Sequence, residues 1–152
     1  MVHSLFASSL SLAEDPKIFK TRYTDISYTD SKALGAFLWR IGGKRFNFDD
    51  DPALAKSRID RIIDRVMDVL DMHPRRFHVK VFVRDKYKEG RVAYYSNKDA
   101  SITLYADKIT DGIFAHEVAH AVICSFFVKT PTETMQEVLA QYVDKHLWSD
   151  YD

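Results

Sequence analysis

The clearest pattern of apolar and polar positions lies in the middle of the chain, between Asp51 and Pro74. Its apolar residues recur every three to four positions, which is the spacing of one face of an α-helix. Asp51 is a suitable N-cap, Pro52 suits the first helical position, and Pro74 stops the pattern. We therefore predict a long amphipathic helix. Its core-facing residues are Ile59, Ile62, Ile63, Val66, Met67, Val69 and Leu70.

After Pro74 the pattern changes from a helical period to alternation. In "FHVKVFV", residues 77–83, every second position is a valine, which predicts a strand with one buried face. Two further runs, "VAYYS" at 92–96 and "SITLYA" at 101–106, are rich in β-branched and aromatic residues. The four residues "NKDA" between them predict a β-hairpin.

The end of the chain returns to helical spacing. We predict one helix from about Thr110 to Phe127 and a second from about Pro131 to Trp148, separated by a break at Pro131. No internal repeat or low-complexity run interrupts this part of the chain. A helix, three strands and two helices in this order predict a domain of α+β class.

Residues 1–48 are the part of the sequence that is hardest to interpret. "KIFKTRYTDISY" at 17–28 is compatible with a strand, and "SKALGAFLWRIGG" at 31–43 with a short helix that glycine stops. We expect one domain over residues 1–152, in which 49–152 form the readable core.

The length and composition of the chain limit the classes of function that it can have. The chain has 152 residues, of which 46% are apolar, so it can bury a hydrophobic core without the help of a disulfide or a structural metal. A bound metal would therefore be functional rather than structural. Lys and Arg together number 22, as do Asp and Glu, and this balance argues against a nucleic-acid partner.

The location of the protein is predicted from what the sequence lacks. Cys124 is the single cysteine, which excludes an intramolecular disulfide. The start, "MVHSLFASSLSLAEDP", has no basic region, and no apolar run approaches the roughly 20 residues that span a bilayer. We therefore expect a cytoplasmic protein with no membrane partner.

The stretch "FAHEVAHAVI" holds the candidate chemistry. His116 and His120 are four positions apart, so on a helix they point the same way and can share one ion. Glu117 lies about 100° round from His116, a position that suits a base beside the metal. The alternative is that both histidines are ordinary side chains bonded to backbone carbonyls.

A catalytic zinc needs a third protein ligand and an open position. The downstream candidates are Glu133, Glu137, Asp144 and His146. If the last helix returns antiparallel, Glu137 reaches the level of His120 after a rise of about 9 Å, and it is the favoured ligand. We expect Glu133 to be occupied in a capping box with Thr130 as N-cap.

Together, His116-Glu117-x-x-His120 and the later "EVLA", which contains Glu137 and Ala140, resemble the gluzincin branch of zinc metallopeptidases over about residues 77–148. Among these, the chain is most similar to small stand-alone ImmA/IrrE-like members. The resemblance implies a zincin fold, in which a small mixed β-sheet packs on the active-site helix and a second C-terminal helix. It also implies a peptide or protein substrate along an edge strand, for which Ser101–Ala106 is the candidate.

The resemblance implies one Zn²⁺ per chain held by His116, His120 and Glu137, with Glu117 as the general base. Gln141, one turn past Glu137, is a candidate acceptor for a ligand histidine. Enzymes of this kind often add a tyrosine or histidine donor to the oxyanion, and the tyrosines in suitable strands are Tyr94, Tyr95 and Tyr105, which are otherwise packing residues. Two alternatives remain: a catalytically silent zinc-binding module that binds proteins, and a metal-free helical protein.

Overall fold

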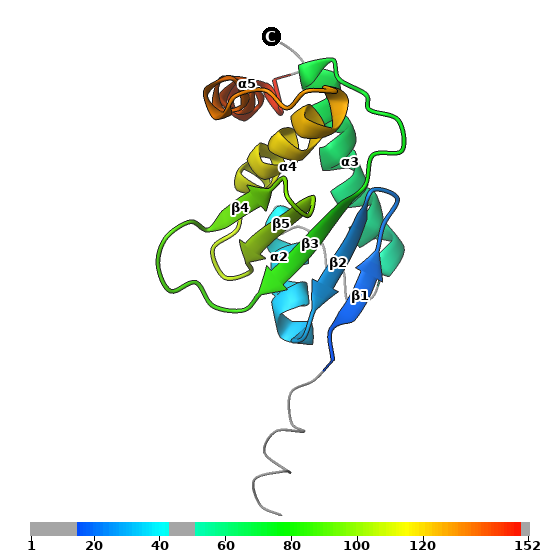
Figure 1. The fold of residues 1–152 in the computed structure, drawn as a ribbon. Coiled ribbons are helices and arrows are strands. Elements are labelled where there is room, and N and C mark those ends of the chain that lie inside the picture. Colours follow the sequence, from blue (N-terminus) through cyan, green and yellow to red (C-terminus); the bar gives the residue numbers. More distant parts are fainter. Residues whose placement is uncertain (1–14, 43–50, 150–152) are drawn as a thin grey trace, which may run out of the picture.

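The computed structural model describes residues 15–42 and 51–149. They form one α+β domain, a mixed five-stranded sheet packed against four helices (Figure 1). The predicted fold class is therefore confirmed. Most of the sequence's apolar start lies outside the described residues, and the domain boundaries at 1 and 152 stay predictions.

The first third of the chain adds two strands and a helix. β1 (Lys17–Lys20) and β2 (Thr24–Tyr28) form an antiparallel pair, where the sequence suggested a single strand. Residues Thr21 and Thr24 make the turn between them, with the two hydroxyl oxygens 2.7 Å apart. Helix α2 (Ser31–Ile41) follows, and its backbone ends at Gly42 as predicted. These elements complete the core, since Ile26, Phe37 and Ile41 are fully buried.

Helix α3 (Pro52–Leu70) confirms the central amphipathic pattern. The carboxylate of Asp51 caps it by accepting a hydrogen bond from the N–H of Leu54 at 3.1 Å. Strand β3 (Val79–Arg84) follows, and its alternating valines are buried while the residues between them are exposed or half-buried.

The remaining strands close one side of the sheet. β4 (Ala93–Ser96) and β5 (Ser101–Tyr105) form the predicted antiparallel hairpin. The strand order is β1-β2-β3-β5-β4, in which β2, β3 and β5 run parallel. The prediction that residues 101–106 form an edge strand was wrong, because β5 pairs with β3 on one side and with β4 on the other. Ile102 and Leu104 are fully buried, which favours the interior position for β5.

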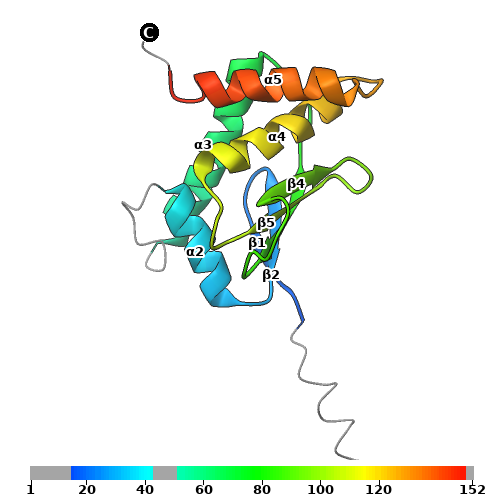
Figure 2. The ribbon, with the colours of Figure 1, turned by 90° about the vertical axis from the view of Figure 1, so that its left-hand side faces the viewer.

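The helices form layers on the sheet. Figure 2 shows α2 and α3 against one face, with α4 (Asp111–Phe126) crossing above the strands. α4 contacts α3, β4 and β5, whereas α5 (Glu133–His146) packs on α4 and α3 farther from the sheet. This arrangement leaves α4 between the edge strand β4 and the last helix, so side chains from all three elements can meet.

Within residues 15–42 and 51–149, no helix combines the length and the apolar character that crossing a bilayer requires. The cytoplasmic location stays a prediction.

Candidate metal centre

The two histidines of α4 and one carboxylate of α5 meet in space. His116 and His120 lie on the same face of α4, with ring centroids 5.3 Å apart. Across the helix pair, Glu137 places Oε1 2.8 Å from Nε2 of His120 and Oε2 3.4 Å from Nε2 of His116. One ligand atom from each residue lies within 4.8 Å of the others. The structure therefore assembles a cluster, His116–His120–Glu137, that can hold a metal ion.

The other nitrogen of each ring is held by α5. Nδ1 of His120 lies 3.0 Å from Oε1 of Gln136, and Nδ1 of His116 lies 3.0 and 3.1 Å from the two carboxylate oxygens of Asp144. The amide of Gln136 is oriented by the carbonyl of Pro131, which accepts from its Nε2 at 2.9 Å. Both partners of the Nδ1 atoms are thus acceptors, so both Nδ1 atoms carry the hydrogen and donate.

The Nε2 atoms of both rings face Glu137. When Nδ1 carries the hydrogen of a neutral imidazole, Nε2 presents a lone pair, and here both lone pairs face the carboxylate of Glu137. Acceptors repel each other unless a proton or a cation lies between them. One divalent cation relieves both contacts, and two neutral imidazoles with a carboxylate are a donor set that zinc prefers.

The negative charges around His116 also favour a positive charge at the cluster. Burial alone lowers the pKa of His116, but its hydrogen bond with Asp144 and the negative charges of Asp144, Glu117 and Glu137 outweigh this, and the net pKa is raised. The surroundings therefore stabilise positive charge at the cluster.

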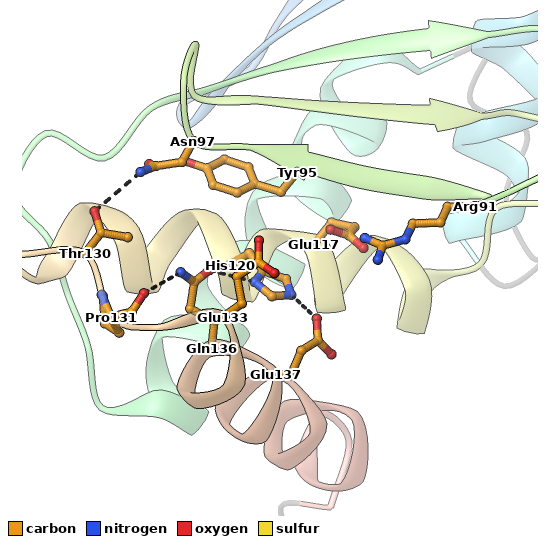
Figure 3. Close-up of a pocket in the computed structure, with 10 residues that line it drawn as sticks. All are labelled: Arg91, Tyr95, Asn97, Glu117, His120, Thr130, Pro131, Glu133, Gln136 and Glu137. Carbon is orange, nitrogen blue, oxygen red and sulfur yellow. Dashed lines mark hydrogen bonds and ion pairs between the residues drawn. The ribbon is translucent and has the colours of Figure 1, made fainter.

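Beside the cluster lies a cavity of about 420 Å³ between β4, α4 and the start of α5 (Figure 3). Glu117 projects from α4 into it and is only 8% exposed. Burial raises the pKa of Glu117, and the charges of His120 and His116 oppose the rise. The residues that line the cavity are Arg91, Tyr95, Asn97, Glu117, His120, Thr130, Pro131, Glu133, Gln136 and Glu137.

Of the three tyrosines considered as oxyanion donors, only Tyr95 lines this cavity. Its hydroxyl donates to Oδ1 of Asn97 at 3.3 Å, and burial raises its pKa to about 12, with the charges of Cys124 and Asp99 adding to the effect. Tyr94 is 42% exposed, and Tyr105 packs edge-on against Tyr87.

The start of α5 differs from the prediction. The N-cap is Thr132, whose hydroxyl accepts from the N–H of Met135 at 3.2 Å, so the proposed capping box between Thr130 and Glu133 was wrong. Thr130 instead accepts from the side-chain amide of Asn97 at 3.4 Å. The helix begins two residues later than expected, because Pro131 and Thr132 are not helical. Glu133 is the first helical residue, and it lines the cavity.

Sequence reasoning missed the two residues that hold His116 and His120. It named Gln141, which is exposed, and this was wrong because Gln136 and Asp144 are the acceptors. Asp144 follows Glu137 by seven positions, two helical turns, so the spacing already placed it on the face of Glu137. Gln136 gave no comparable signal.

If the cluster binds a metal ion, replacing Asp144 by asparagine is expected to weaken the binding of a probe ion such as Zn²⁺ by about 10- to 100-fold, because a hydrogen-bonded carboxylate orients a metal-binding histidine and raises its basicity. Competition with a chromophoric chelator measures the affinity. The matched control is Asp85→Asn, which makes the same change at an exposed position after β3. Equal affinities in the two variants would contradict a supporting role for Asp144.

Comparison of the chain with protein-family models, with curated proteins and with solved structures finds no match.

Proposed function

We propose that this protein is a zinc-dependent peptidase. The observation that supports this most is the pair of Nε2 atoms held against the carboxylate of Glu137, with Glu117 buried in the adjoining cavity. A site that only stabilised the fold would need no buried carboxylate there. The described residues bury an extensive apolar core, so the fold has no need of a metal for its stability, which favours a functional role for the ion.

His116, His120 and Glu137 hold the ion in this proposal, and three protein ligands leave it an open position. When bound, zinc supplies a Lewis acid that polarises a carbonyl and lowers the pKa of a coordinated water. Gln136 and Asp144 keep the two imidazoles in the tautomer that coordination requires.

Glu117 serves as the general base. It takes a proton from the attacking water and passes it to the nitrogen of the leaving amine, acting first as base and then as acid. A carboxyl group whose pKa is raised by burial is better suited to return the proton than an exposed one.

The substrate lies along β4, which is the edge of the sheet next to the cavity. Because the N–H of Tyr105 bonds to the carbonyl of Val92, the alternate residues Ala93 and Tyr95 turn their backbone groups toward the open edge. A peptide that pairs with this edge is held through its backbone and passes over Glu117.

Tyr95 is the group that we assign to the developing oxyanion. It is the tyrosine of β4 that lines the cavity, and with a pKa of about 12 it keeps its hydrogen at neutral pH and can donate it. Its present acceptor is Oδ1 of Asn97.

The test is metal-dependent cleavage of peptides. The zinc-loaded protein is incubated with a mixture of chymotryptic peptides from denatured casein, which contain inner lysine and arginine residues, and new ends are identified by mass spectrometry. We expect cleavage that 1,10-phenanthroline stops and that added zinc restores. Zinc binding without cleavage of any peptide would overturn the peptidase and favour a zinc-binding module for protein interaction.

A further inference from the structure

The cavity beside the metal cluster has two chemically different ends. Figure 3 shows Arg91 next to Glu117 at one end and Asn97 with Thr130 at the other. At the second end, Nδ2 of Asn97 donates to the hydroxyl of Thr130 at 3.4 Å, and this bond joins the segment after β4 to the segment before α5. Asn97, Thr130 and Glu133 are solvent-exposed, so a side chain of a bound ligand can reach this end of the cavity from outside.

Several polar groups at the end of the cavity near Asn97 and Thr130 are acceptors. Oδ1 of Asn97 faces the hydroxyl of Tyr95, because Nδ2 of the same amide is turned to Thr130. Glu133 lines the same cavity with its carboxylate group, as does Pro131, whose carbonyl accepts from Nε2 of Gln136. A ligand group that complements them must bring hydrogen-bond donors, and lysine and arginine have donors and no acceptors.

The negative charge of Glu133 also favours a cationic ligand group. Among the described residues, no cation lies within 4.0 Å of its carboxylate. Arg91, the cation of the cavity, lies beside Glu117 instead (Figure 3). The ring of Tyr95 adds an aromatic surface in the same cavity, and aromatic faces attract ammonium and guanidinium groups.

A simpler role for Glu133 would be purely structural. It is the first residue of α5, where a negative charge favours the helix dipole. That role accounts for an acid in the first turn, but it predicts only a change in stability when the charge is removed. A role in recognition predicts a change in selectivity between cationic and neutral ligands, so the two can be separated.

We propose that the end of the cavity formed by Tyr95, Asn97, Thr130, Pro131 and Glu133 binds a lysine or arginine side chain of the bound peptide, and that Glu133 determines this specificity. The proposal rests on the function proposed above, since it names the substrate class of that same site. Glu133 is a specificity residue in it and takes no part in the proton transfers.

Peptide binding tests the proposal without requiring turnover. The ligands are fluorescein-labelled hexa-alanine peptides, in each of which a single inner alanine is replaced by arginine, norleucine or glutamate. Zinc-loaded Glu117→Gln protein is titrated into each peptide, and fluorescence anisotropy gives the dissociation constant. At one position we expect arginine to bind about tenfold more tightly than norleucine, and glutamate more weakly than either. Adding Glu133→Gln should bring the arginine and norleucine peptides within about twofold of each other.

The matched control adds Glu89→Gln, which removes the same charge from an exposed residue that does not line the cavity. This variant should keep the preference for arginine. An absence of preference at every position, an absence of binding by every peptide, or a preference that survives Glu133→Gln would overturn the proposal.

Cleavage by the wild-type protein separates this inference from the proposed function. Cleavage of the peptides without a preference that depends on Glu133 would leave the peptidase standing and overturn the cationic pocket. Binding that depends on Glu133, with no cleavage of any peptide, would support the pocket and overturn the peptidase.

Discussion

Replacing Glu117 by glutamine is expected to reduce peptide cleavage by about 10²- to 10⁴-fold and to leave the zinc content unchanged. Glutamine has nearly the shape of glutamate, so it fits the buried position on α4, but its amide cannot take up the proton of the attacking water. The ligand atoms belong to His116, His120 and Glu137, and the substitution removes none of them. Initial rates on one cleaved peptide and elemental analysis of the same preparation measure the two effects.

The control for this experiment is Glu89→Gln, the same chemical change at an exposed residue outside the cavity. It should keep wild-type activity, which shows that loss of one negative charge is not itself the cause. If the Glu117 variant retained its activity, Glu117 would not be the base, and if it lost zinc as well, the loss of cleavage would no longer identify a proton-transfer role.

The second large effect concerns the ligands. His120→Ala and Glu137→Ala are each expected to lower the zinc content of the purified protein from about one ion per chain to a small fraction. Apparent binding free energies of about 10–16 kcal/mol for four-ligand structural zinc sites correspond to roughly 3 kcal/mol per ligand, or a loss of about 100-fold in affinity. The protein is purified without a histidine tag and without added metal, and zinc is measured by elemental analysis.

Two matched variants test whether the loss is specific. His78→Ala removes a histidine whose Nε2 lies 3.3 Å from Asp25, and Glu89→Ala removes an exposed glutamate, both outside the cluster. Both should keep the zinc content of the wild type. Circular dichroism should show the ligand variants folded, because the core lies mainly among apolar residues elsewhere in the domain. Zinc that remained bound in both ligand variants would contradict the three-ligand site.

The elements that were predicted well are those whose signals are local. The period of the apolar residues in α3, the cap at Asp51 and the stop by glycine after α2 all depend on neighbours within a few positions. The alternation of β3 is equally local. Such signals are present in the sequence because they reflect backbone geometry and capping rather than tertiary packing.

The elements that were missed depend on distant partners. The place of β5 between β3 and β4 follows from parallel pairing with a strand about twenty residues earlier, and no short-range pattern encodes it. The start of α5 was placed two residues too early because Thr130 and Thr132 are both good caps, and the contact of Thr130 with Asn97 across the cavity favours the later one.

By itself, the sequence determined that His116, Glu117 and His120 lie together on one helix, because the period of an α-helix brings positions four apart to one face. It also favoured Glu137, among the acids and histidines after Pro131, as the third residue of the cluster. Tertiary structure alone decided that Glu137 meets both histidines, that Gln136 and Asp144 fix their tautomers, and that β4 is the edge beside Glu117. These features depend on how α5 docks on α4 and how the strands pair, and such contacts join residues far apart in the chain.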